Sequence, residues 1–132
     1  MSGRVVLFGL DGATFALLDH FVELGVMPFL GEWMKSGARG LLRSTIPPLT
    51  PPAWTTLVTG RSPGVHGIFN FLQYESPTSP YLRILNSRMI GCETIWSMVS
   101  RAGLRAGSLN FVAHSPALPV NGYMIPGWVP WR

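Results

Sequence analysis

The sequence predicts an α/β fold, a layered domain with a mainly parallel sheet flanked by helices. Short strand-like runs alternate with helical patterns along the chain, which is typical of this class. The first run, Val5 to Leu10, is apolar almost throughout, as in strands that are buried on both faces of a parallel sheet. A length of 132 residues suits one domain with a real core, so we expect residues 1–132 to form a single domain.

After this first strand the sequence predicts two short helices. Thr14 is a suitable N-cap for the first helix, which ends at Gly25. Pro28 opens the second helix and Gly37 ends it. Gly40 to Arg43 is a candidate short strand. The apolar side chains expected on the inner faces of the two helices are Phe15, Leu18, Phe21, Val22, Phe29, Leu30, Trp33 and Met34.

The middle of the chain is rich in proline and glycine. Ile46 to Pro52 predicts a shaped loop, because proline disfavours the interiors of helices and sheets. A helix follows from about Pro51 to Thr59, and Gly60 closes it. Residues 61–80 predict mostly loop. The buried face of the helix is expected to consist of Trp54, Leu57 and Val58.

The last third of the chain predicts two strands, a helix and a final strand-like segment. Tyr81 to Leu85 alternates like a strand, and Thr94 to Ala102 predicts a helix around Trp96. Ala106 to Val112 predicts the next strand, and Asn121 to Trp128 predicts a strand that runs into a loop. In open α/β sheets, ligands bind at the carboxyl ends of the strands.

The composition limits the classes of partner. Charged residues make up 12% of the chain, about half of the roughly 25% that is usual, so we expect part of the surface to be covered by a partner chain or by the rest of a longer protein. The net charge is +4, but the arginines are scattered and predict no nucleic-acid footprint. Some of them are candidates for steering an anionic substrate.

The sequence also bears on the cellular location of the protein. No apolar run approaches the roughly 18 residues of a membrane-spanning helix, so no membrane segment is expected. The N-terminus lacks the features of a signal peptide. The single Cys92 cannot form an internal disulfide. We therefore expect a cytoplasmic protein.

Two residues are candidates for chemistry. Asp11 follows the first strand and could supply a hard oxygen ligand to a metal ion, although an aspartate before Gly12 is also a common turn residue. Thr50 stands at a helix start, where the helix dipole favours a phosphoryl group, although a threonine there is also a common N-cap. A metal-activated threonine hydroxyl can attack phosphorus. No pair of the three histidines has metal-ligand spacing. We expect His20 on the exposed side of its helix, His66 as a hydrogen-bonding loop residue and His114 as a turn residue.

Three motifs occur in order: Leu10-Asp11-Gly12, the loop Ile46 to Pro51 that contains Thr50, and the segment Thr59-Gly60-Arg61-Ser62-Pro63-Gly64-Val65-His66-Gly67. Together with Thr94-Ile95-Trp96 and Pro119 to Gly122, they resemble the N-terminal portion of the type I phosphodiesterase/nucleotide pyrophosphatase family of the alkaline phosphatase superfamily. The resemblance covers nearly the whole chain. It implies an alkaline-phosphatase-like fold, a phosphate-ester small molecule as substrate, and two divalent metal ions, zinc foremost and manganese as the alternative. It also implies that Asp11 is a metal ligand and that Thr50 is both nucleophile and metal ligand; the substrate-binding residues are unknown.

The sequence departs from the family pattern in two ways. Nucleotide-cleaving members often carry Asn where this chain has Ala53, which puts nucleotide cleavage in doubt. The chain has only two aspartates, Asp11 and Asp19, and three histidines, which cannot build a closed two-metal site. We therefore expect an incomplete domain, the N-terminal segment of a metal-dependent phosphoric ester hydrolase, inactive in isolation.

Two alternatives stay open. The first is a truncated, non-catalytic relative that acts as a binding or interaction module. The second is a nucleotide- or anion-binding protein that uses the helix start at Thr50, although the chain has no Gly-rich phosphate loop. An incomplete domain is expected to expose an apolar face for self-association or for a complementing chain. The residues expected on that face are Ile125, Trp128, Val129 and Trp131.

Overall fold

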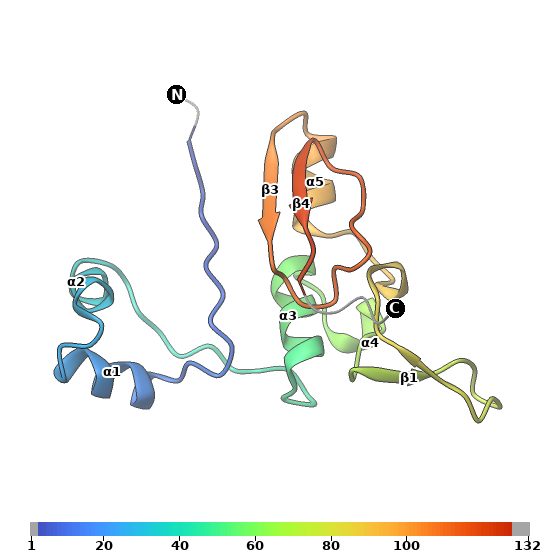
Figure 1. Ribbon diagram of the computed structural model, residues 1–132, viewed down its shortest axis with the longest axis horizontal. Coiled ribbons are helices and arrows are strands. Elements are labelled where there is room, and N and C mark those ends of the chain that lie inside the picture. The colour runs from blue at the N-terminus through green and yellow to red at the C-terminus, as the bar shows by residue number, and fades with distance from the viewer. Residues whose placement is uncertain (1–2, 128–132) are drawn as a thin grey trace. The chain divides into compact units, whose positions relative to one another are not determined.

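The computed structural model describes residues 3–127 (Figure 1). The chain divides into two compact units, Met1–Leu42 and Arg43–Arg132, and each is described here by itself. The expectation of a single domain stays a prediction.

The first unit holds two helices, α1 (Phe15–Glu23) and α2 (Pro28–Ser36), which pack on each other. The Thr14 hydroxyl caps α1 by accepting a hydrogen bond from the Leu17 amide at 3.4 Å. The turn between the helices passes through Gly25, whose φ of +70° suits a residue without a Cβ. Both helices and both of their ends are therefore as the sequence predicted.

The strand predicted at Val5 to Leu10 is wrong for the described chain. The segment is extended, but no strand of the described residues pairs with it, and Val5 is 94% exposed. Gly40 to Arg43 is likewise not a strand. A strand is defined by hydrogen bonds to a neighbour, and an apolar run indicates burial without naming that neighbour.

The inner face predicted for α2 is also wrong in part. Phe29 and Trp33 pack against each other, with ring centroids 4.8 Å apart, but Trp33 is 61% exposed. Gly31 is the buried residue of α2, and it allows Val22 of α1 to approach closely. Two nine-residue helices bury little more than the strip along which they touch.

The second unit contains most of the regular structure. β3 and β4 form a parallel pair in which Ser108 lies opposite Met124, while β1 and β2 form an antiparallel hairpin in which Gln73 lies opposite Arg83. Helix α5 packs on β3, and Figure 1 shows both beside β4. A parallel pair with flanking helices confirms the predicted α/β class and corresponds to an incomplete alkaline-phosphatase-like domain. The elements in chain order are α3 (Thr50–Thr59), α4 (Pro63–His66), β1 (Leu72–Tyr74), β2 (Leu82–Ile84), the short 3₁₀ helix η1 (Ser87–Met89), α5 (Ile95–Arg101), β3 (Ala106–Leu109) and β4 (Gly122–Ile125).

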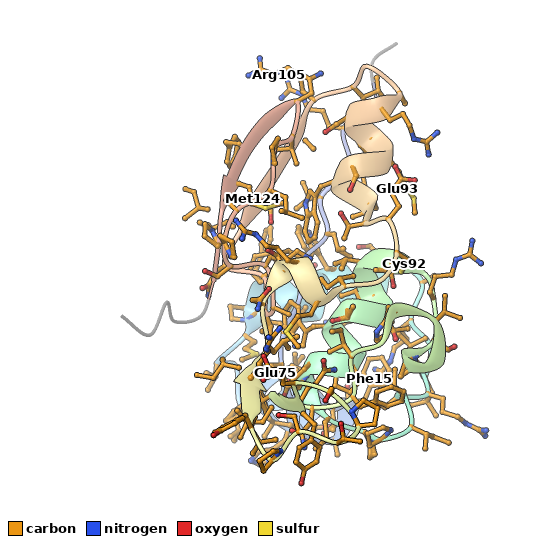
Figure 2. All side chains as sticks on the ribbon, turned by 90° about the vertical axis from the view of Figure 1, so that its right-hand side faces the viewer. Phe15, Glu75, Cys92, Glu93, Arg105 and Met124 are labelled. Atoms are coloured by element: carbon orange, nitrogen blue, oxygen red, sulfur yellow. The ribbon has the colours of Figure 1, made fainter. Side chains whose placement is uncertain are left out.

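Most elements of this unit match their sequence predictions. Helix α3 begins one residue before the predicted start, and Gly60 ends it with a left-handed φ of +64°. The predicted strands at Tyr81 to Leu85 and Ala106 to Val112 are present in shorter form as β2 and β3. Helix α4 and strand β1 were not predicted from the sequence, and both lie in the segment predicted as mostly loop. Figure 2 shows Cys92 and Glu93 in the segment that leads into α5, and Met124 on β4.

The core of the second unit is built on aromatic side chains. Trp96 of α5 meets Phe111 edge to face, with ring centroids 4.9 Å apart, and Val58 of α3 completes the buried cluster. Leu57 was predicted to be buried and is exposed, whereas Thr55 and Thr59 are buried instead. The inner face of α3 is set by where the aromatic cluster lies, which a helical pattern alone does not show. Trp54, Ala106, Val120 and Met124 pack around the cluster.

The candidate active site

Thr50 is the first residue of α3, and its surroundings hold it firmly. The preceding loop is tied together at Pro47, whose carbonyl oxygen accepts hydrogen bonds from the Thr45 hydroxyl at 2.8 Å and from the Leu49 amide at 3.0 Å. Leu49 is extended and forms the N-cap position, so Thr50 is not itself the cap. Thr50 is half-buried, and the two prolines that follow it are fully buried. The position at a helix start that the sequence predicted is confirmed.

The N-terminus of α3 offers few amide donors. In an ordinary helix the first three N–H groups have no partner within the helix and can bind an anion. Here the second and third positions are Pro51 and Pro52, which have no N–H group. The next amide, that of Ala53, already donates to the Leu49 carbonyl oxygen at 3.1 Å. The dipole of α3 still favours negative charge, but a bound phosphoryl group needs donors from elsewhere.

Asp11 lies in a turn that follows the extended segment of the first unit. It is exposed, Gly12 after it has a φ of +68°, and the Thr14 amide donates to the Gly12 carbonyl oxygen at 3.0 Å. Asp11 therefore occupies a turn between the extended segment and α1. Thr50 belongs to the other unit, so the expected proximity of the two side chains stays a prediction.

The residues present do not fit a complete metal centre. Among residues 3–127, no group of three or more His, Cys, Asp or Glu side chains is placed to hold a metal ion. Asp19 forms a two-pronged ion pair with Arg39, at 3.0 and 2.9 Å, and the same arginine lies over the ring of Phe15. Asp19 thus has a structural partner in Arg39. Any metal bound through Asp11 and Thr50 would need further ligands.

His66 is the best-connected histidine. It is fully buried at the end of α4, and both ring nitrogens have partners: Nδ1 accepts from the Ile68 amide at 3.1 Å, and Nε2 lies 3.0 Å from the Thr56 hydroxyl oxygen. Burial lowers the pKa of His66, and a hydrogen bond to the Pro52 backbone offsets part of that effect. The prediction of a hydrogen-bonding role is confirmed, but the sequence did not show that its partners would lie on α3.

His114 was predicted to be a turn residue and is instead buried after a turn, at the edge of the aromatic core. Its Nδ1 lies 2.6 Å from the Val112 carbonyl oxygen, and its ring meets Trp96 with centroids 4.5 Å apart. Burial lowers the pKa of His114. The carbonyl can only accept, so Nδ1 carries the proton and donates to it. His114 therefore packs in the core as a neutral ring.

A sequence model of the family described as type I phosphodiesterase / nucleotide pyrophosphatase matches residues 5–131. The chain belongs to this family, and membership supports a function of the phosphoric-ester-hydrolase type on phosphate-ester substrates. The family is generally metal-dependent. No solved structure matches the chain.

No helix within residues 3–127 has both the length and the apolar character needed to cross a membrane.

Proposed function

We propose that this chain carries the nucleophile of a metal-dependent phosphoric ester hydrolase. Thr50 is the nucleophile, and Asp11 and Thr50 are ligands of divalent metal ions, with zinc foremost and manganese as the alternative. The observation that carries the proposal is the family match over residues 5–131, which includes both residues. The position of Thr50 at the start of a buried helix supports it.

The proposed reaction passes through a covalent intermediate. The Thr50 Oγ attacks phosphorus, a new Oγ–P bond forms, and the bond from phosphorus to the ester oxygen breaks. The leaving group takes up the proton lost from the Thr50 hydroxyl and departs as an alcohol. Water then hydrolyses the phosphothreonine and restores the hydroxyl. The few amide donors at the start of α3 leave the phosphoryl oxygens dependent on other groups, and Ala53 supplies no side-chain donor.

The remaining metal ligands would come from outside these 132 residues. The described part of the chain brings no three potential ligands together, and Asp19 is held by Arg39. The 132-residue chain alone is therefore expected to be inactive. We also propose a cytoplasmic location, which the unpaired Cys92 supports.

A non-catalytic interaction module is the second candidate. It is favoured by the exposed apolar side chains of the first unit, since Val6 and Phe8 are 85% and 78% exposed. Such side chains would be covered by a second copy or by a complementing chain. Ile125, predicted on such a face, is 55% exposed, while Trp128, Val129 and Trp131 lie outside the described residues.

The downstream DNA sequence and an activity assay distinguish the hydrolase from the interaction module. The DNA beyond the codon for Arg132 is read for an Asp-x-x-x-His pattern and an Asp-His pair, and the full encoded product is assayed with bis(p-nitrophenyl) phosphate and zinc or manganese. Thr50→Val removes the hydroxyl at nearly constant shape, while Thr50→Ser keeps it. The hydrolase proposal expects turnover that Thr50→Val abolishes and Thr50→Ser retains in part. A product without these patterns and without turnover would establish the module instead.

The shared metal site has its own test. Asp11 and Thr50 must approach within about 5 Å to reach one ion, because metal–oxygen distances are about 2.0–2.2 Å. Paramagnetic Mn²⁺ added to the ¹⁵N-labelled full encoded product should then broaden the amide signals of Asp11 and Thr50 together. Broadening of one of the two signals without the other would refute the shared site.

A further inference from the structure

His66 connects the short helix α4 to the helix that begins with Thr50. Its side chain is fully buried, and its ring nitrogen Nε2 lies 3.0 Å from the hydroxyl oxygen of Thr56. Thr56 lies on α3, six residues after Thr50. The ring thus contacts this helix less than two turns from its first residue.

The hydrogen bonds determine where the proton of the ring lies. The Ile68 amide can only donate, so Nδ1 must carry a lone pair. A neutral imidazole carries one proton, and the Thr56 hydroxyl oxygen near Nε2 can accept it in a hydrogen bond. The proton is therefore on Nε2, which donates toward α3. Burial lowers the pKa of His66, which favours this neutral form at pH 7.

The ring itself is held in place from its own side. The His66 carbonyl oxygen accepts from the Gly91 amide at 2.9 Å. The next residue, Gly67, is left-handed with a φ of +79°, and its carbonyl oxygen accepts from the Gln73 side chain at 2.6 Å. These hydrogen bonds fix the backbone on both sides of the ring. The Nε2 donor of His66 therefore has little freedom to move with α3 if the helix rotates.

This arrangement bears on the direction of the Thr50 side chain. The apolar contacts of α3 with the core are non-directional, and they tolerate small rotations of the helix about its axis. A hydrogen bond is directional and weakens steeply when it is bent. Rotation of α3 would carry the Thr56 hydroxyl away from the ring and would re-aim Thr50 by the same angle.

We propose that His66 is a positioning residue for Thr50: as a neutral, Nε2-protonated ring it sets the rotation of α3 and thereby the direction of the Thr50 hydroxyl. This inference rests on the proposed function for its catalytic meaning, because it assigns no chemistry to His66 itself. It requires only that the orientation of Thr50 depend on a contact less than two turns further along the helix.

The test uses the 132-residue chain and compares two neighbouring threonines. Thr56→Val removes the hydroxyl that the ring contacts. Thr55→Val is the matched control, because the Thr55 hydroxyl is buried on the same helix and has no hydrogen-bond partner among the described residues. Residual dipolar couplings of the α3 amides, compared with those of β3 and β4, report the rotation of α3 about its axis, and amide hydrogen exchange reports the opening of α3.

In the unchanged chain we expect α3 couplings that fit one rotation of the helix, and a long-range ¹⁵N spectrum that shows His66 protonated on Nε2. In the folded Thr56→Val variant the α3 couplings should shift or average, and exchange of the α3 amides should quicken by up to about tenfold. The Thr55→Val control should keep the couplings of the unchanged chain. A purely structural role would lower stability and leave the couplings of the folded form unchanged.

Two results would overturn the inference. One is a His66 ring protonated on Nδ1 in the unchanged chain, a measurement that needs no variant. The other is a set of α3 couplings that stays the same in Thr56→Val, or in His66→Gln should Thr56→Val not fold. A Thr50 that proves to have no catalytic role would refute the proposed function but leave the coupling result standing, so the two failures are distinguishable.

Discussion

Replacing Trp96 by alanine should remove the centre of the aromatic core. Trp96 is 5% exposed and meets two other rings edge to face, Phe111 at 4.9 Å and His114 at 4.5 Å. Truncation of a buried tryptophan to alanine costs about 3–5 kcal/mol in unfolding free energy, because apolar burial is lost and a cavity is left. The loss of each aromatic pair contributes about 0.5–1.5 kcal/mol to this decrease in the free energy of unfolding.

This loss is large relative to the stability that the second unit can have. At about 0.05–0.15 kcal/mol per residue, a unit of about 90 residues is stable by roughly 5–13 kcal/mol. The buried cluster contains, besides Trp96, only Val58 and Phe111, so few other side chains can compensate. We therefore expect the Trp96→Ala variant to lose between a quarter of its stability and nearly all of it.

Urea unfolding followed by circular dichroism measures the effect. With an m value near 2 kcal/mol per M, the loss lowers the midpoint by about 2 M. The matched control is Trp33→Ala, because Trp33 is 61% exposed and an exposed substitution changes stability by about 0.5 kcal/mol or less. Equal midpoints for the two variants would refute the reasoning, since that result would mean that Trp96 does not organise the core.

Burial lowers the pKa of His66 and His114 in the folded protein, so the unfolded chain binds more protons. The free energy of unfolding therefore keeps its full value above about pH 6.5 and decreases as the pH falls toward the folded-state pKa values. The decrease is at most about 1.4 kcal/mol per pH unit for each histidine. Urea midpoints that rise on acidification from pH 7.5 to 5 would contradict this. Gly122→Ala should destabilise by roughly 1–3 kcal/mol, because its φ is +148° and the added methyl would overlap a carbonyl oxygen of the paired strand β3. Gly64→Ala in α4 meets no atom within 4 Å and should be neutral or slightly stabilising, and equal losses in the two glycine variants would exclude the clash. The purified 132-residue chain should not turn over nitrophenyl phosphate esters with or without zinc or manganese, and strong turnover that Thr50→Ala abolishes would show that the chain holds more of the site than we infer. The chain should also bind a hydrophobic dye through its exposed apolar side chains, and a dye-silent monomer in sedimentation at high concentration would argue against an uncovered face.

The ends of the helices could be predicted because the signals that set them are local. The Thr14 hydroxyl caps α1 within its own first turn, and Gly60 and Gly103 take left-handed conformations directly after α3 and α5. The position of Thr50 at the start of α3 follows from the same kind of signal, since proline is favoured in the first turn of a helix. None of these features requires knowledge of a distant residue.

Partners that are distant in the chain could not be predicted in this way. Val5 to Leu10 has the composition of a buried strand, yet a strand forms only where a neighbour supplies hydrogen bonds, and no described residue does. Within α3 the sequence pattern favoured Leu57 as a buried residue, but the aromatic cluster lies on the side of Thr55 and Val58.

The family, the α/β class, the boundaries of the longer helices and the candidate nucleophile could be read from the sequence, because each depends on residue type and short-range order along the chain. The contact of His66 with Thr56 and the packing of His114 against Trp96 became visible only in the folded chain. These contacts join residues at least ten positions apart, and their energies depend on burial and on the angle between groups. Neither quantity exists until the chain has folded.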